Sequence, residues 1–474
     1  MAIERQGRSE GQFVRGLGLW DASAIVAGGM IGSGIFIVSQ DVATRVGSPG
    51  WLLVVWLVTG VMTVLCALSY AELASMFPQA GGQYVYLREA FGPLAGFLYG
   101  WTLFLVIQSG SIAAVGVAFA KYLNVVVTSA GLGSYGPWTE RGIGIVMIAA
   151  LTAINCIGLS AGKWVQDVFT AIKALTLVAL VGLGVAFLRS DAALFTAGFF
   201  DARELVGAGA ASHWQPLGGV ALATAVGVAM VGSLFAADAW NNVTFVAAEV
   251  KEPRRNVGLS LVLGAGGVIL LYVLVNVAYL ATLPMETIAR AENQRVAAEM
   301  MQAILGPAGA VALAVAVLVS TFGCNNGLIL TGARLVYAMA RDDLFFKAAG
   351  ELGARSRVPV KALVIQGVWS SLLVLSGSYS DLLDYVIFAA LLFYVVTLAG
   401  IFVLRRKMPD AERPYRAWGY PVVPAVYMAA AVCIMLVLLV YKPSFTWPGL
   451  GIVAAGVPVY FVWRWLGRRR CAAA

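Results

Sequence analysis

The chain has 474 residues, of which 60% are hydrophobic and only 12% are charged, and its mean hydropathy is +0.85. A water-soluble domain cannot bury that much apolar surface, so the composition excludes a soluble protein and predicts an all-α protein that crosses a lipid bilayer many times. The net charge of +8 does not indicate nucleic acid binding, because the basic residues lie in short loops beside apolar segments.

About twelve apolar segments reach the roughly 20 residues that are needed to cross the hydrocarbon core. In chain order they cover residues 20–44, 51–77, 94–127, 142–158, 164–188, 217–250, 257–283, 308–340, 360–377, 382–404, 422–441 and 450–466. An even number of spans places both ends of the chain on the same side of the membrane.

The positive charges predict which side that is. With the N-terminus in the cytoplasm, only eight of the 32 lysines and arginines fall in outer segments, and Lys173 and Arg334 fall inside spans. The eight are Arg45, Lys121, Arg141, Arg189, Arg203, Arg290, Arg295 and Lys442. Cytoplasmic loops are enriched in lysine and arginine. This bias therefore predicts a multi-pass membrane protein with both termini in the cytoplasm. The membrane that we expect for it is the plasma (inner) membrane.

The first apolar segment contains a glycine-rich stretch, Gly28-Gly29-Met30-Ile31-Gly32-Ser33-Gly34. Each glycine costs an α-helix about 1 kcal/mol relative to alanine, and backbone groups that a broken helix frees in a membrane need partners. A break here predicts a cavity, an ion or a ligand. Close helix packing through small residues explains the same glycines equally well, so the stretch alone does not decide between packing and binding.

The sixth segment lies five spans after the first, and an odd offset inverts the topology. Spans 1–5 and 6–10 therefore fit two inverted repeats, residues 16–189 and 215–404, which together form a transport core over residues 1–404. Residues 405–474 add two helices and a cytoplasmic tail. The sixth segment has a polar interruption from Phe235 to Asn242, but no glycine or proline there supports unwinding.

Two ionisable side chains lie at the depth of the first break. At about 1.5 Å per residue, Lys173 and Asp238 both fall near the middle of the bilayer. Ionisable residues at that depth are functional candidates by default. Lys173 can occupy a cation site between helices or donate to helix carbonyls in a purely structural role. Asp238 can bind a substrate amine, accept a proton or cap the half-helix that follows it, and of these we favour the cap.

Several other candidates have ordinary structural explanations. Phe235 and Trp240 can gate a site, although packing is the commoner role of aromatic residues. Arg334 can extend to the membrane surface or pair with an acid, and Gln108 can face a cavity or bond to another helix. The only histidine, His213, lies in a loop, and the five cysteines lack a C-x-x-C spacing. The sequence therefore predicts no metal site and no cofactor.

Six motifs, in order along the chain, resemble the amino acid–polyamine–organocation permeases and, among them, the L-type amino acid transporter branch. They are Gly32-Ser33-Gly34-Ile35-Phe36; Tyr70-Ala71-Glu72-Leu73 with Pro78-x-Ala80-Gly81-Gly82-x-Tyr84; Asp238-x-Trp240-Asn241; Glu249-Val250-Lys251-Glu252-Pro253; Ser320-Thr321-Phe322-Gly323 with Thr331-Gly332-Ala333-Arg334; and Arg405-Arg406-Lys407-x-Pro409-Asp410-x-x-Arg413-Pro414-Tyr415. Each motif alone is weak, but six in order at matching spans are specific.

The resemblance implies the five-plus-five inverted-repeat fold of leucine-transporter-like proteins, with spans 1 and 6 discontinuous. It also implies that backbone N–H groups of Ser33, Gly34 and Ile35 bind a substrate carboxylate, since the start of a half-helix offers free donors and a positive dipole. The substrate amino group would meet carbonyl oxygens of both breaks, those of Ala27, Met30 and Phe235.

The same resemblance assigns further roles around the breaks. Phe235 matches a gating aromatic, Trp240 and Asn241 stabilise the second break, and Lys173 looks like the lysine that replaces a sodium ion in sodium-independent members. The outer loop at residues 124–141 contains no cysteine, so no disulfide-linked ancillary subunit is expected, and we expect a monomer or a weak homo-oligomer. The full predicted substrate-binding set is Ala27, Met30, Ile31, Gly32, Ser33, Gly34, Ile35, Phe235, Asp238, Trp240 and Asn241.

The function that these observations predict is sodium-independent transport of neutral L-amino acids by alternating access, as amino acid exchange. A neutral substrate is preferred because only Asp238 offers a charge in the pocket, and for that residue we favour the role of a cap. Proton symport through Lys173 or Asp238 is an alternative, as is a carrier of cationic amino acids or polyamines with Asp238 as a direct ligand. A nutrient sensor on a transporter fold is a further alternative. A membrane enzyme is disfavoured, because the spans hold no pair of catalytic acids.

Overall fold

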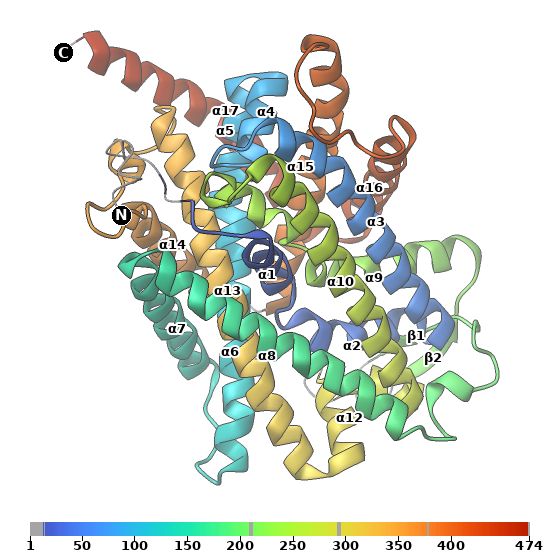
Figure 1. The fold of residues 1–474 in the computed structure, drawn as a ribbon. Helices are drawn as coiled ribbons and strands as arrows, with labels where there is room; N and C mark the ends of the chain where they lie inside the picture. Colours follow the sequence, from blue (N-terminus) through green and yellow to red (C-terminus); the bar gives the residue numbers. More distant parts are fainter. Residues whose placement is uncertain (1–12, 14, 208–211, 292–294, 377–378, 473–474) are drawn as a thin grey trace, which may run out of the picture.

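The fold was analysed in a computed structural model, which describes residues 13–472 except residues 14, 208–211, 292–294 and 377–378 (Figure 1). Within this part the protein is mainly helical. Its one sheet among the described residues is a short antiparallel hairpin of β1 (Arg203–Val206) and β2 (His213–Pro216). The predicted all-α polytopic fold is confirmed.

Each of the twelve predicted apolar segments is helical over most of its length. Ten described helices are long and apolar enough to cross a membrane, and an eleventh span is formed by a bent pair of helices. The remaining segment forms α14 (Val360–Ser376), which has 17 residues. The unbroken spans are α3 (Pro49–Met76), α7 (Pro137–Ile157), α8 (Leu159–Ala186), α10 (Pro253–Thr282), α13 (Pro307–Arg341), α15 (Tyr379–Lys407), α16 (Val422–Tyr441) and α17 (Pro443–Ala472).

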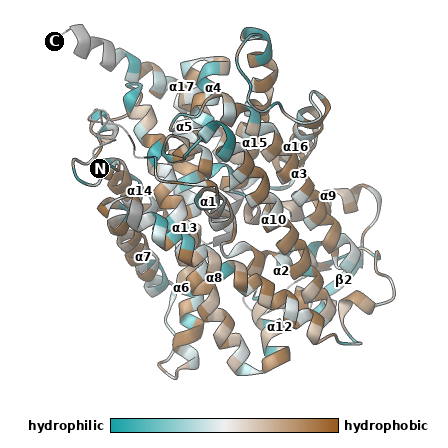
Figure 2. Cartoon of the chain, in the orientation of Figure 1, coloured by the Kyte–Doolittle hydropathy of each residue, from teal (hydrophilic) through white to brown (hydrophobic). Residues whose placement is uncertain are grey.

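Large apolar side chains cover the outside of the helices as well as their interior. Leu175, Leu263 and Leu436 are exposed on α8, α10 and α16, and Figure 2 shows hydrophobic residues along the helix surfaces, with hydrophilic residues gathered at the loops. A helix that is apolar all round is typical of a membrane span, because lipid is as apolar as the protein core.

The third span contains an irregularity in its middle. It runs through α5 (Pro93–Thr102), a π-helical turn η1 (Leu103–Ile107) and α6 (Gln108–Ser129) without interruption. π-Helical turns are rare and often occur at functional sites. The polar residue Gln108, one of the candidates from the sequence, comes directly after this turn.

Two spans are broken near their midpoints. The first consists of α1 (Leu19–Met30) and α2 (Gly34–Val46), which are bent by 41°. The sixth consists of α9 (Gly219–Ala236), an irregular turn and a 3₁₀ helix, η4 (Trp240–Glu249). Because α2 packs against α9 and α1 against η4, the two broken spans lie side by side in antiparallel orientation. The break in the sixth span, which rested on polarity alone, is confirmed.

One end of the bundle, here called the α4 end, holds the short helix α4 (Gln83–Phe91), the 3₁₀ turn η6 (Lys347–Gly350) and the described start of the chain (Figure 1). Tyr84 donates a 2.6 Å hydrogen bond to Asp342, which also pairs with Arg88. Burial and the Asp342 carboxylate raise the pKa of the Tyr84 phenol. Glu72 of α3 accepts hydrogen bonds from Arg405 at 3.0 and 2.6 Å.

The opposite end, here called the hairpin end, holds β1, β2 and three short helices. These are η2 (Ala193–Phe195), α11 (Met285–Ala289) and α12 (Val296–Leu305). Trp214 of β2 donates a 2.5 Å hydrogen bond to Glu286 of α11. The pKa of Glu286 is lowered. Burial alone would raise this pKa, but the hydrogen bonds from Trp214 and Arg290 outweigh the effect of burial. The hairpin is thereby attached to the loop between α10 and α12.

Candidate functional site

The end of α1 at Met30 leaves the carbonyls of Gly28, Gly29 and Met30 without the helical partner that Ala27 still has in the Ile31 N–H, at 2.8 Å. Each of the three accepts a hydrogen bond from the side chain of another helix. Gly28 accepts from the Lys173 ammonium, Gly29 from the Cys324 thiol at 3.1 Å and Met30 from the Tyr272 hydroxyl at 2.8 Å. Side chains of α8, α10 and α13 thus stabilise the break.

The start of α2 supplies backbone donors at the same place. The first N–H groups of a helix have no carbonyl acceptor within it, and the helix dipole favours a negative charge there. Gly34 opens this helix beside the end of α9, where a Cβ would lie 2.6 Å from the Cβ of Ala236. The close helix packing that the glycines indicated is therefore present at the break, and binding of a ligand there stays a prediction.

The second break turns on a non-glycine residue in a left-handed conformation, Ala239, with φ of 66°. Trp240 packs its ring against Tyr70 and Tyr394, with centroids 4.9 and 5.4 Å apart. Asn241 donates a 3.0 Å hydrogen bond to the Gln83 side chain. These contacts attach the second break to α3, α4 and α15.

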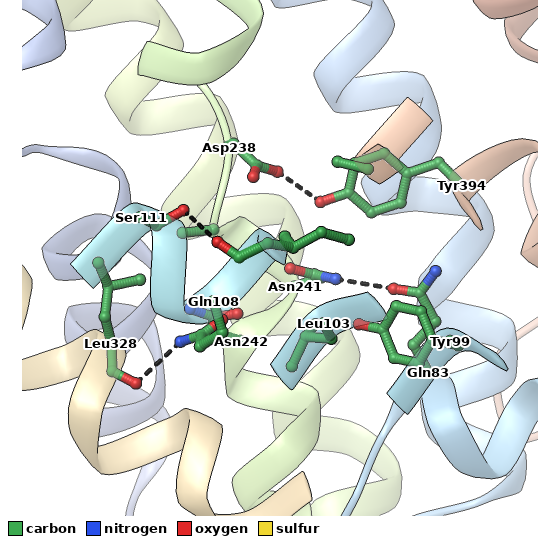
Figure 3. Close-up of a pocket in the computed structure, with 13 residues that line it drawn as sticks. Gln83, Tyr99, Leu103, Gln108, Ser111, Asp238, Asn241, Asn242, Leu328 and Tyr394 are labelled. Atoms are coloured by element: carbon green, nitrogen blue, oxygen red, sulfur yellow. Dashed lines mark hydrogen bonds between the residues drawn. The ribbon is translucent and has the colours of Figure 1, made fainter. Parts of the chain in front are cut away.

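Asp238 does not cap the half-helix, so that interpretation is wrong. The half-helix η4 begins at Trp240 with Ala239 as its N-cap residue. The Asp238 carboxylate instead accepts a 2.5 Å hydrogen bond from the Tyr394 hydroxyl (Figure 3). It lines three adjoining cavities at the second break. The carboxylate is therefore available to groups that enter these cavities.

The cavity between the two breaks has an empty volume of about 340 Å³. Six residues of the predicted substrate-binding set line it, namely Met30, Gly32, Ser33, Gly34, Phe235 and Asp238. Ala27, Ile31 and Ile35 do not line it, while Trp240 and Asn241 line the neighbouring cavities. The breaks therefore meet around one space, although the predicted set spreads beyond it.

Lys173 lies behind this cavity. Its side chain is fully buried, and its ammonium contacts the Gly28 carbonyl from α8. It does not line the cavity itself. The sequence left two roles open for Lys173, a cation site between helices and donation to a helix carbonyl. The observed contact is donation to a helix carbonyl, and this carbonyl belongs to the first break.

A second cavity, of about 320 Å³, lies beside the π-helical turn (Figure 3). Its lining is rich in uncharged polar side chains, including Gln83, Tyr99, Gln108 and Asn242. Gln108 donates a 2.8 Å hydrogen bond to the Leu328 carbonyl, so both interpretations of this residue hold.

A buried ion pair holds η4 at the α4 end. Arg334 of α13 approaches Glu249 at 2.9 Å, and the two side chains are 1% and 2% exposed. Of the two alternatives given for Arg334, pairing with an acid is therefore the one that the structure shows. The backbone of Glu249 also accepts hydrogen bonds from the N–H groups of Gly16 and Leu17, both at 3.0 Å. The segment before α1 is thereby joined to the end of η4.

Sequence reasoning missed several residues at the first break. Tyr272, Ser320 and Cys324 bond to its carbonyls from α10 and α13. The spacing of Ser320 and Cys324, four residues apart on one helix face, was a readable signal. Tyr272 and Tyr394 had none, because a tyrosine in an apolar span looks like ordinary packing.

Two broken spans that meet around a cavity in a polytopic helical protein define a membrane transporter. The family described as Amino acid permease matches residues 17–462, so the chain belongs to the amino acid permease family. The b(0,+)-type amino acid transporter 1 of Mus musculus is 29% identical over 467 residues, 95% of this chain and 89% of that protein. The Large neutral amino acids transporter small subunit 2 of Homo sapiens is 32% identical over 453 residues, 94% of this chain and 80% of that protein.

These relatives confirm the resemblance to the L-type branch of the permeases. They are amino acid transporters by name, and amino acid transport is the general function that family membership supports.

Proposed function

We propose that the protein exchanges L-amino acids across the plasma membrane, independently of sodium, by alternating access. The observation that carries the proposal is the cavity at which both broken spans meet. The antiparallel packing of α1–α2 against η4–α9 supports two inverted repeats with this cavity at their interface.

In this proposal the substrate carboxylate binds the backbone N–H groups at the start of α2, at Ser33, Gly34 and Ile35. The amino group would bind the carbonyls of Met30 and Phe235, with Ala27 farther from the cavity. The Met30 carbonyl already accepts bonds from the Tyr272 hydroxyl and the Gly32 N–H, both at 2.8 Å, and that of Phe235 accepts from the N–H groups of Asp238 and Ala237. A carbonyl oxygen has two lone pairs, so the substrate amino group would replace one of the present donors at each.

Lys173 acts in this proposal as a fixed positive charge in place of a coupling sodium ion. Its ammonium contacts a carbonyl of the first break, which is where a cation would otherwise satisfy the freed backbone oxygen. Sodium would then have no site to fill at this position.

For the substrate class we propose neutral L-amino acids, because the rest of the cavity lining is uncharged. Amino acids with a cationic side chain are a second candidate. The preference for a neutral substrate depended on Asp238 acting as a cap, and its carboxylate instead faces the cavities. A side-chain ammonium would find a charge partner there.

We also propose that the chain works without a disulfide-linked ancillary subunit. One relative is named a small subunit, which implies a larger one for that protein. Here the loop at residues 124–141 holds no cysteine, and the described free cysteines, Cys66, Cys156, Cys324 and Cys433, all lie within helices.

The test is uptake by the purified chain alone in proteoliposomes. Radiolabelled leucine and arginine are offered outside, with leucine, arginine or no amino acid inside, with and without a pH gradient and with sodium or choline. If the protein is an exchanger, uptake should occur only into vesicles that contain an internal amino acid. Uptake into empty vesicles that depends on the pH gradient would replace exchange with proton symport, and dependence on sodium would contradict the role of Lys173.

The Asp238→Asn variant separates the two substrate classes in the same assay. If the wild type takes up arginine and the variant loses arginine but retains leucine, Asp238 binds the cationic side chain. If the wild type takes up arginine but not leucine, and unlabelled alanine does not compete with arginine, the neutral assignment fails.

A further inference from the structure

A row of polar side chains on α8 faces the backbone of α1. Gln166, Thr170 and Lys173 follow one another at spacings of four and three residues, so they lie on one face of the helix. All three are buried, with 1%, 7% and 0% exposure. Gln166 Nε2 and Thr170 Oγ1 donate to the Ala24 carbonyl at 3.3 and 3.2 Å, and Lys173 donates to the Gly28 carbonyl one turn further along.

Gln166 is enclosed by glycine on two sides. A Cβ on Gly28 of α1 would lie 1.8 Å from its Nε2, and a Cβ on Gly327 of α13 would lie 2.9 Å from its Oε1. Any other residue at either position would displace the amide. Gly28 therefore has a specific role in the glycine-rich stretch, which is to let a side chain of α8 lie against the backbone of α1.

The same amide also bonds to α13. Asn326 Nδ2 donates to Gln166 Oε1 at 3.4 Å and to the Gly162 carbonyl at 3.0 Å. Asn326 in turn accepts a 2.8 Å hydrogen bond from Asn155 of α7. The Gln166 amide thus donates to α1 with its nitrogen and accepts from α13 with its oxygen, and no apolar side chain can do both.

We infer that Gln166 is a positioning residue: its amide holds the half of span 1 before the break in register with α8 and α13. This register presents the Gly28 carbonyl to Lys173 and sets where the backbone donors of the break lie. Gln166 touches neither the cavity nor the proposed substrate, so it acts through α1. The effect on substrate binding rests on the proposed function, whereas the effect on α1 does not.

The test is Gln166→Met, which keeps the length of the side chain and removes both hydrogen-bonding groups. The matched control is Gln366→Met. Gln366 of α14 is also 1% exposed, donates to a helix carbonyl (Ile329 of α13, 3.3 Å) and lies against a glycine, Gly332. The described hydrogen bond of Gln366 goes to α13 and not to α1. The Gln366→Met variant therefore measures the general effect of losing a buried amide.

Three measurements are made on the full-length variants. Hydrogen exchange in peptides covering residues 19–30 should be at least about tenfold faster in Gln166→Met and unchanged in Gln366→Met. The Kd of radiolabelled leucine or arginine, whichever the wild type binds, should rise about tenfold only in Gln166→Met. Thermal unfolding should shift similarly in both variants.

The outcomes separate the two ideas. If α1 exchanges no faster in Gln166→Met than in wild type, the positioning role is wrong, whatever the transport data show. It is also wrong if both variants weaken substrate binding to the same extent. If the wild type binds no amino acid while exchange in α1 still responds to Gln166→Met, the proposed function fails and the positioning of α1 stands.

Discussion

Single backbone groups, more than charged side chains, determine the chemistry of the site. The freed carbonyls of Gly28, Gly29 and Met30 each have a side-chain donor from a different helix. A buried carbonyl without a donor costs about 1–3 kcal/mol. These donors therefore explain how a broken helix is tolerated at the middle of a membrane.

Gly34 is the residue whose replacement should be most informative. Gly34→Ala places a Cβ 2.6 Å from that of Ala236, so α2 must move away from α9 at the cavity. Uptake should fall by at least about tenfold, equivalent to ~1.4 kcal/mol, and Gly34→Val should abolish it. Gly182→Ala in α8, where a Cβ meets nothing within 4 Å, is the control and should transport normally. An active Gly34→Val variant would contradict a carboxylate site at this break.

Lys173 gives a second prediction at the scale of the residue. Lys173→Ala and Lys173→Met remove the donor to the Gly28 carbonyl, at a cost of about 1–3 kcal/mol in stability, which a folded protein can tolerate. Both variants should remain monodisperse in detergent but lose most of their transport. The measurement is uptake over a series of pH values. Normal transport by both at every pH would exclude the roles of cation surrogate and of proton carrier.

At the scale of the element, the proposed alternating access would require the two broken spans to rearrange. The half-helix η4 is a 3₁₀ helix of 10 residues, although 3₁₀ helices rarely exceed four residues. It is held by contacts outside itself, namely the Arg334–Glu249 pair, the Asn241–Gln83 bond and the backbone bonds to Gly16 and Leu17.

We therefore expect that removing one member of the Arg334–Glu249 pair destabilises η4, because the other charge stays buried without a partner. Arg334→Met alone leaves a buried carboxylate and should destabilise the protein by about 3–5 kcal/mol. The double variant Arg334→Met/Glu249→Leu leaves no buried charge and should recover much of that loss. Thermal unfolding in detergent measures both. A double variant as unstable as the single one would show that the pair also makes contacts that apolar side chains cannot replace.

For the whole molecule, the α4 end and the hairpin end differ in charge. The loops around Arg88, Lys361 and Arg405 belong to the α4 end, where the described start of the chain also lies (Figure 1). The positive-inside rule assigns this end to the cytoplasm.

Single-cysteine labelling tests this orientation in intact cells. A cysteine at Gly133, in the turn between α6 and α7, should react with an impermeant maleimide. A cysteine at Arg355, in the loop before α14, should react only after the membrane is permeabilised. Both sites are exposed, so burial does not limit their reaction. The reverse pattern would invert the assigned topology.

Local composition was sufficient for the spans and for the first break. A run of apolar residues in a membrane must be helical, because no water is present to satisfy the backbone, so all twelve segments were predictable. Four glycines within seven residues made the break at Ile31 to Ser33 readable. The π-helical turn at Leu103 to Ile107 was not readable, because its residues are apolar and it depends on helix packing.

The sequence by itself determined the class of the protein and the apolar segments that form its long helices, because hydrophobicity acts along the chain. Only the tertiary structure decided what Lys173 and Asp238 do. It turned Asp238 toward Tyr394 and the cavities rather than toward the half-helix, and it brought Lys173 to the Gly28 carbonyl. In both hydrogen bonds the two partners are 145 or more residues apart in the chain. Helix packing brings such partners together, and no local sequence pattern records it.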